Sequence, residues 1–303
     1  MPINLHSFFV YVFFGYFFIF PLVFLCLKIF EIEHPRQRMG FYMTALFVPF
    51  AGFLLYHSVL STRCQAGIYP GGVFWEIFDL FCRAGNTAIR FLGPILALLL
   101  LLGLVKAAGS GLYLGRLRSR SMEPTVDQRR LVLGLLKKHC GNWQMTVPDV
   151  IFTGRTGFAA FAAGMFKPVV VISVPLLTNL SAAELEGILV HELVHIRRRD
   201  TISGWLLHLA RDLMFFSPFS TVLLDSYLLE RERLCDQETV KALGSSRAYA
   251  ATMLKIWRLL VEQKELRPGL SAGFIGKKQD MELRIHSLLA ADPDAGRMPT
   301  ILF

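Results

Sequence analysis

The sequence predicts a mainly α protein in which several transmembrane helices are followed by an α+β domain. Residues 8–27 and 39–60 contain no Asp, Glu, Lys or Arg, and residues 91–114 are interrupted only by Lys106. The composition agrees, because 53% hydrophobic residues, 26 Phe and a mean hydropathy of +0.47 lie outside the range of ordinary soluble domains. In the second half, an apolar run between two prolines predicts a strand, and helical periodicity follows it.

Each of the three uncharged stretches is long enough to cross about 30 Å of hydrocarbon. Residues 1–27 contain no Lys or Arg, so the first stretch is a retained span and not a signal peptide, which needs a positive start. Eight basic residues between Lys106 and Lys138 predict that the chain after the third span is cytosolic. The N-terminus and the loop 62–90, which holds Cys64 and Cys82, are then outside.

The resulting organisation is a membrane domain at 1–118 and a membrane-associated cytoplasmic domain at 119–303. The basic residues that flank the predicted spans explain the net charge of +9, because they attract anionic lipid head groups. We therefore expect no direct nucleic-acid binding. Residues 119–128 are the predicted linker. The chain is therefore expected to be a multi-pass protein of a cell membrane, and of the bacterial inner membrane in particular.

The strand predicted at residues 169–174 lies between Pro168 and Pro175. Two interpretations stay open for it: an edge strand that holds an extended peptide by main-chain hydrogen bonds, or a plain core strand. The glycine-rich segments 154–164 and 267–276 are candidate mobile flaps.

The motif HELVH at His191–His195 is the most informative feature of the chain. Ser181 and Glu184 form a capping-box pattern that begins a helix, and residues i and i+4 of a helix share one face. Two histidines one turn apart can bind one metal ion, while Glu192 between them handles protons. The spacing therefore predicts a zinc site with Glu192 as its general base.

A catalytic zinc takes three protein ligands, so a third must come from elsewhere in the chain. Residues 201–229 are apolar but broken by Pro218, which predicts two helices that meet at a Ser-Pro-Phe turn. If the following segment LLERERLCDQETV is helical, Glu232 faces inward with Asp236 one turn later. This is typical of gluzincins, in which Glu232 would bind the metal and Asp236 would accept a hydrogen bond from a ligand histidine.

Other polar residues receive weaker predictions. Cys235 is interpreted as a small buried residue of the same helix. Tyr249 and Arg284 are candidates for stabilising an oxyanion, although no spacing in the sequence places them near the zinc.

Several segments together resemble the membrane-embedded metallopeptidases of the beta-lactam sensor-transducer (BlaR/MecR-type antirepressor) family. They are KPVVVISVPLL, LSAAELEGILVHELVHIRRRD, FFSPFS, ERERLCDQETV and, more weakly, LRIHSLL, and the resemblance covers about residues 90–290. It implies one Zn²⁺ per chain, held by His191, His195 and Glu232, with Glu192 as general base. Many such transducers continue into a penicillin-binding sensor, whereas this chain ends at Phe303, so beta-lactam sensing is not expected to carry over.

The expected function is that of a zinc endopeptidase that cleaves a cytosolic or membrane-proximal protein. By resemblance, the substrate would be a transcriptional repressor in a signalling pathway. Two alternatives remain. A quality-control or processing protease of the HtpX or CAAX type also combines HExxH with a later Glu and Asp, and a receptor that no longer cleaves would be a non-catalytic signal transducer.

Overall fold

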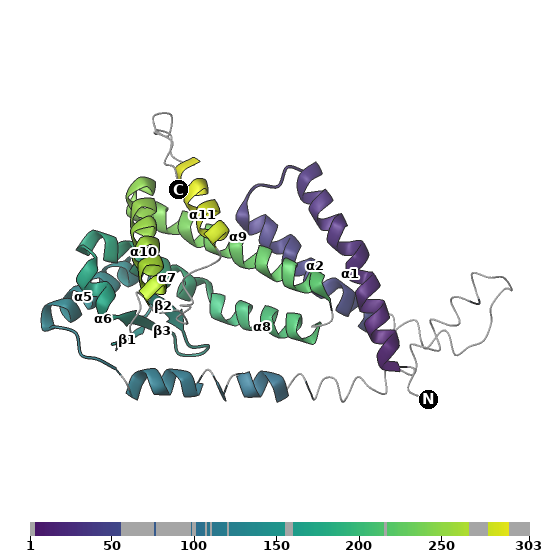
Figure 1. Cartoon of the computed structure of the whole chain (residues 1–303), viewed down its shortest axis with the longest axis horizontal. Coiled ribbons are helices and arrows are strands. Elements are labelled where there is room, and N and C mark those ends of the chain that lie inside the picture. The colour runs from purple at the N-terminus through teal and green to yellow at the C-terminus, as the bar shows by residue number, and fades with distance from the viewer. Residues whose placement is uncertain are drawn as a thin grey trace. The chain divides into compact units, whose positions relative to one another are not determined.

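A computed structural model of the chain describes residues 4–55, residues 76 and 98, and, with short gaps, residues 101–154, 160–266 and 278–290 (Figure 1). The chain divides into two compact units. The first contains Met1–Ala108 and Gly204–Arg231, and the second contains Gly109–Ser203 and Glu232–Phe303. The predictions on Cys64 and Cys82, on the loop 62–90 apart from residue 76, on the candidate flap 267–276 and on residues 155–159 of the other flap lie outside the described residues.

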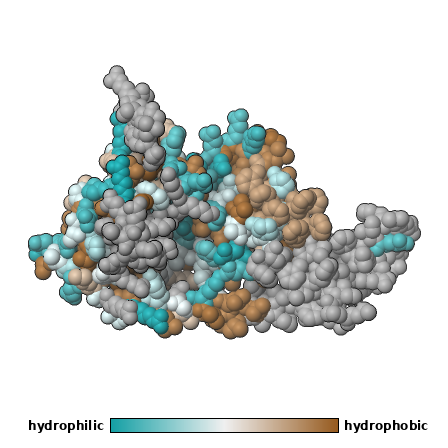
Figure 2. All heavy atoms as spheres, viewed as in Figure 1, coloured by the Kyte–Doolittle hydropathy of each residue, from teal (hydrophilic) through white to brown (hydrophobic). Residues whose placement is uncertain are grey.

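The first unit is built on two long apolar helices. Helix α1 (Asn4–Ile29) packs against α2 (Pro35–Leu55), and the Tyr16 hydroxyl of α1 donates a hydrogen bond of 2.7 Å to the Leu46 carbonyl of α2. Large apolar side chains on the other faces of α1 are exposed, among them Phe17 and Phe18. Figure 2 shows the resulting brown surface over α1 and α2. Such a continuous exposed apolar face is typical of contact with lipid.

Among the described residues, α1 alone is both long and apolar enough to cross a membrane, through Val12–Ile29. This stretch overlaps the first predicted span. Helix α2 coincides with much of the second predicted span, but its first turn carries Arg36 and Arg38, and residues 56–60 lie outside the described part. Within the third predicted span, residues 98, 101–106, 108–109 and 111–114 are helical, and the helix continues past the span to residue 119. The second and third spans stay predictions.

The second unit contains a three-stranded sheet of order β1-β3-β2 (Figure 1). Strand β1 (Asp149–Thr153) runs parallel to β3 (Val169–Ser173), and β2 (Ala160–Ala163) runs antiparallel to it. The predicted strand is confirmed as β3, whose five residues are all buried at the centre of the sheet. Because β3 is paired on both sides, the interpretation of it as an edge strand is wrong, and β2 is an edge instead.

Helices share a buried cluster with this sheet. They are α5 (Val126–Asn142), α6 (Val174–Asn179), α7 (Ala182–Arg198) and α10 (Ser246–Leu266), and α11 (Lys278–Ala290) packs on α10. Leu185 and Leu189 of α7 share one buried cluster with Val170 and Ile172 of β3 and with Leu136 of α5. Helix α7 is therefore held on two sides by apolar packing, which makes it a rigid platform for side chains on its remaining face.

Two helices each contain residues that belong to both units. Helix α8 (Asp200–Leu213) and helix α9 (Pro218–Leu243) are separated by a turn that includes Ser217. The prediction of two helices that meet at the Ser-Pro-Phe turn is confirmed. Glu230, near the end of the first-unit part of α9, is buried and forms an ion pair of 2.7 Å with Arg38 of α2.

Candidate metal centre

Helix α7 carries both histidines of the HELVH motif. Its start is the predicted capping box: the Ser181 hydroxyl accepts from the Glu184 N–H, and the Glu184 carboxylate accepts from the Ser181 N–H at 2.8 Å. This start sets the register in which His191 and His195 share one face. Their Nε2 atoms lie 3.1 Å apart, and the His191 side chain is 1% exposed.

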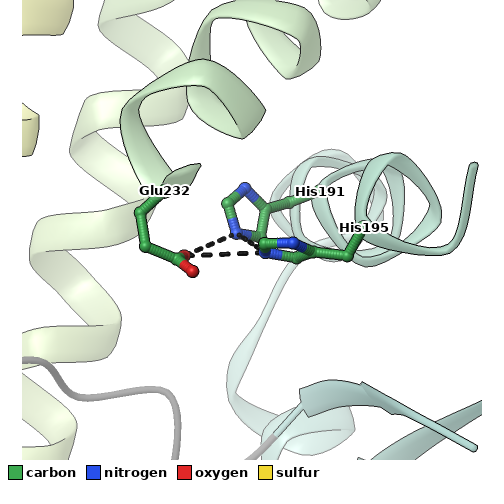
Figure 3. Close-up of side chains that lie close together, drawn as sticks. All are labelled: His191, His195 and Glu232. Carbon is green, nitrogen blue, oxygen red and sulfur yellow. Dashed lines mark hydrogen bonds and ion pairs between the residues drawn. The ribbon is translucent and has the colours of Figure 1, made fainter. Parts of the chain in front are cut away.

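Helix α9 places Glu232 beside the two histidines (Figure 3). Its Oε2 atom lies 3.4 Å from His191 Nε2 and 3.6 Å from His195 Nε2. Burial by itself raises the pKa of the Glu232 carboxyl, but the two histidines and Arg284 lower that pKa well below its usual range. The third residue is therefore an ionised oxygen donor facing two imidazole nitrogens.

These three donor atoms fit a tetrahedral zinc site. Bonds of 2.0–2.1 Å to zinc at tetrahedral angles place neighbouring donor atoms about 3.3 Å apart. The three separations here are 3.1, 3.4 and 3.6 Å, close to that value on every side of the triangle. The Glu232 side chain is 23% exposed, so solvent can reach part of this side chain. A set of two nitrogens and one carboxylate oxygen is also the donor chemistry of catalytic zinc.

Glu192 points from α7 toward the edge of the sheet. Its Oε2 atom accepts a hydrogen bond of 2.6 Å from the backbone N–H of Ala162 in β2. Because residues of an antiparallel strand face its two sides alternately, this N–H and that of Ala160 belong to the edge that does not pair with β3. Burial raises the pKa of the Glu192 carboxyl, which suits a group that takes up and releases a proton.

Asp236 lies behind His191, one turn after Glu232. Its Oδ1 atom is 3.3 Å from His191 Nδ1, and the Tyr249 hydroxyl donates to the same Oδ1 at 3.0 Å while lying 2.9 Å from that Nδ1. Gly187 explains how Tyr249 reaches the site, because a Cβ at this position would meet the Tyr249 ring at 3.3 Å. The weak helix former in α7 thus provides room for an aromatic side chain of α10.

Arg284 of α11 neutralises Asp236. Its guanidinium donates two hydrogen bonds of 2.7 Å to the two carboxylate oxygens, and its Nη1 atom lies 3.5 Å from Glu232 Oε2. Burial raises the pKa of Asp236, but the Arg284 charge outweighs that effect and lowers the pKa to about 2. The structure therefore brings Tyr249 and Arg284 to the site: both donate to Asp236, and Arg284 also lies beside Glu232, while their role toward an oxyanion stays a prediction.

Asp200 was not singled out by the sequence. Its Oδ2 atom lies 2.8 Å from His195 Nδ1, and the Cys235 Sγ atom lies 3.4 Å from the same oxygen. No local motif predicts this contact, because it depends on how the chain turns between α7 and α8. The capping box, the histidine spacing and the helical stripe of α9 are local patterns, and the sequence alone predicts them.

Comparison with known proteins gives two consistent results. The family described as BlaR1 peptidase M56 matches residues 159–288. The chain is also 27% identical over 173 residues to a protease HtpX homolog of Variovorax paradoxus and 33% identical over 159 residues to protease HtpX of Haemophilus influenzae. The comparisons support a membrane metallopeptidase.

The similarity covers part of each protein. The matches include 52% of this chain in both cases, with 57% of the Variovorax protein and 50% of the Haemophilus protein. A protease HtpX homolog of Methanopyrus kandleri is 29% identical over 43% of this chain and 52% of its own length. The chain thus spans about half the length of the curated relatives that it matches, and the matched family segment contains the HELVH helix, Glu232 and Arg284.

Proposed function

We propose that this chain is a membrane-bound zinc endopeptidase that hydrolyses peptide bonds of a cytosolic or membrane-proximal protein. The observation that carries the proposal is the triangle of donor atoms from His191, His195 and Glu232, with a buried carboxylate from Glu192 beside it. The similarity to peptidase M56 and to HtpX proteases supports the same class of reaction.

His191, His195 and Glu232 would hold the zinc ion. When bound in such a site, zinc polarises a carbonyl group and makes a water molecule more acidic. Glu192 accepts a proton from the attacking water and delivers it to the leaving amine as the amide C–N bond breaks. The products are a carboxylic acid and an amine, and Glu192 returns to its starting state.

The edge of β2 supports an extended substrate. A peptide that pairs with the outer side of β2 would use the N–H and C=O groups of Ala160 and Ala162. A substrate carbonyl that takes the Ala162 N–H would also release the Glu192 carboxylate from its present hydrogen bond of 2.6 Å. Substrate binding and the release of Glu192 would then both depend on the backbone N–H of Ala162.

The test is cleavage of casein, or self-cleavage, by the purified chain in detergent with and without a zinc chelator. We expect activity that the chelator abolishes and zinc restores. Glu192→Ala should abolish cleavage while the protein keeps about one zinc per chain, because all three ligands remain. Glu186→Ala, on another face of α7, is the matched control and should still cleave. Normal cleavage by Glu192→Ala would remove this mechanism, and a zinc-loaded wild type that cleaves nothing would favour the non-catalytic transducer.

The substrate class has two candidates. The resemblance to sensor-transducers favours a transcriptional repressor, whereas the names of the relatives favour a quality-control protease of the HtpX type equally well. A small DNA-binding repressor encoded beside this chain, and cleaved by it in vitro, would select the first. Cleavage of unfolded membrane proteins without cleavage of that repressor would select the second.

The proposed location is a bacterial inner membrane, with the N-terminus outside and the zinc domain in the cytosol. The apolar surface of α1 supports attachment to a membrane, and the basic residues between Lys106 and Lys138 support this orientation. A cytosolic zinc domain would have direct access to cytosolic proteins.

A further inference from the structure

The side of His195 that faces away from Glu232 is occupied by a buried carboxylate. Asp200 is 4% exposed, and its Oδ2 atom lies 2.8 Å from His195 Nδ1. The opposite ring nitrogen, Nε2, is the one that faces Glu232 and His191. Asp200 therefore contacts the imidazole at the nitrogen that is not available to the metal.

The backbone turns sharply to place this carboxylate. Helix α7 ends at Arg198, Arg199 adopts a left-handed conformation with φ 57° and ψ 37°, and Asp200 begins α8. A residue with a Cβ adopts this conformation at a cost in free energy, and such residues concentrate at functional sites. The turn brings Asp200 back beside His195, five residues earlier, where a continuing helix would have carried it to another face.

Two neighbours hold the carboxylate in place. The Arg198 Nε atom donates to both oxygens of Asp200, at 3.2 and 3.3 Å. The Cys235 thiol lies 3.4 Å from Oδ2 and 3.3 Å from His195 Nδ1. Cys235 is fully buried and follows Glu232 by three residues on α9.

Cys235 is placed to steady Asp200 and not to bind the ion. Its sulfur lies on the Nδ1 side of His195, whereas the metal position is on the Nε2 side. At 3.4 Å from Oδ2, the thiol is within the distance at which it donates a hydrogen bond to the carboxylate. This contact joins α9, which carries the ligand Glu232, to the turn that places Asp200 beside the ligand His195.

We propose that Asp200, steadied by Arg198 and Cys235, is the positioning residue for the ligand His195. It accepts the Nδ1–H and thereby selects the tautomer whose Nε2 lone pair is free to bind the metal. His191 has its own partners at Nδ1, in Asp236 and Tyr249, so each ligand histidine is oriented by a separate carboxylate. The inference rests on the proposed zinc site and adds a residue to it.

Zinc affinity of the purified chain in detergent tests this role without reference to proteolysis. Affinity is measured by competition with a chromogenic chelator, and the geometry is followed by the d–d absorption of the Co²⁺-loaded protein. Asp200→Ala should weaken zinc binding by about 10-to-100-fold and change the Co²⁺ spectrum. Asp200→Asn keeps an oxygen that accepts the Nδ1–H, so it should retain most of the spectrum and lose affinity by less than Asp200→Ala.

Glu186→Gln is the matched control. Glu186 is also a carboxylate of this region that contacts a histidine, His139, at 2.7 Å, but it lies away from the metal centre on α7. Its zinc affinity should stay within about twofold of the wild type. The structure therefore contains two His–carboxylate contacts of similar length. The contact of His195 with Asp200 should control metal binding, and the contact of His139 with Glu186 should not.

The outcomes separate this inference from the proposed function. A wild type that binds no zinc would reject the proposed function. A wild type that binds zinc, with an Asp200→Ala variant of equal affinity, would overturn the role of Asp200 alone. An equal loss in Glu186→Gln would also overturn it, because the effect would then belong to α7 in general. If Asp200→Ala does not fold, Asp200→Asn decides, and an affinity and Co²⁺ spectrum identical to those of Glu186→Gln would refute the inference.

Discussion

The buried pair of Asp236 and Arg284 provides the sharpest prediction about stability. The two side chains are 0% and 4% exposed and share two hydrogen bonds of 2.7 Å, so neither has access to water that could replace its partner. The pair also joins α9 to α11, the last helix of the described chain. Removal of one partner leaves an uncompensated charge inside the protein.

Arg284→Met should therefore lower the free energy of unfolding by about 3–5 kcal/mol. For a unit of this size, a loss of that magnitude lowers the melting temperature by roughly 10 °C. Asp236→Asn should also destabilise the fold, because the buried guanidinium then keeps only its ion pair of 3.5 Å with Glu232. The double variant should lose less than the sum of the two single losses, by about 2 kcal/mol, since both charges are then absent.

The assay is thermal unfolding of the zinc-free protein in detergent with a chelator present, which removes any contribution from bound metal. Arg118→Met is the matched control, because Arg118 pairs with Asp149 at 3.0 Å but the two side chains are 67% and 69% exposed. Exposed pairs contribute about 0–1 kcal/mol, so this variant should melt within a few degrees of the wild type. Single losses that simply add, or an Arg284→Met effect no larger than that of Arg118→Met, would refute the reasoning.

Three further predictions follow from other parts of the chain. Gly164 has a φ of 88° and a Cβ there would lie 2.1 Å from a carbonyl oxygen, so Gly164→Ala should lower the unfolding free energy by about 1–3 kcal/mol in chemical denaturation and reduce casein cleavage through β2. Glu230→Ala should lower the melting temperature by breaking the pair with Arg38, and a melting curve equal to that of the wild type would contradict it. Lys137→Cys, exposed on α5, should react with a membrane-impermeant maleimide only after cells are opened, whereas Cys140 is 1% exposed and should react poorly in either case; labelling of intact cells at residue 137 would reverse the proposed topology.

The local parts of the site could be predicted from the sequence. The capping box at Ser181 fixes the register of α7, and the i, i+4 spacing then places His191 and His195 on one face. The same reasoning along α9 predicts that Glu232 faces inward with Asp236 one turn later, and the structure brings both residues to the histidines. These patterns need no knowledge of distant segments.

The parts that depend on tertiary structure could not be predicted. Strand β3 was identified correctly as a strand, but its place at the centre of the sheet depends on pairing with segments on both sides, and the short β2 has no clear alternation of its own. Asp200 reaches His195 only because Arg199 adopts a left-handed conformation, for which a glycine would have been the usual signal. Arg284 lies 48 residues from Asp236, and only the packing of α11 on α10 brings the two together.

Zinc content, measured by elemental analysis on purified wild type, Glu232→Ala and Glu230→Ala, tests the central claim most directly. Both variants remove a carboxylate from α9, but only Glu232 contributes an oxygen to the triangle with the two histidines, whereas Glu230 pairs with Arg38. We predict about one zinc per chain in the wild type and in folded Glu230→Ala, with most of the zinc lost from Glu232→Ala. Full zinc occupancy in Glu232→Ala, or a larger loss in Glu230→Ala, would contradict the assignment of His191, His195 and Glu232 as the metal site.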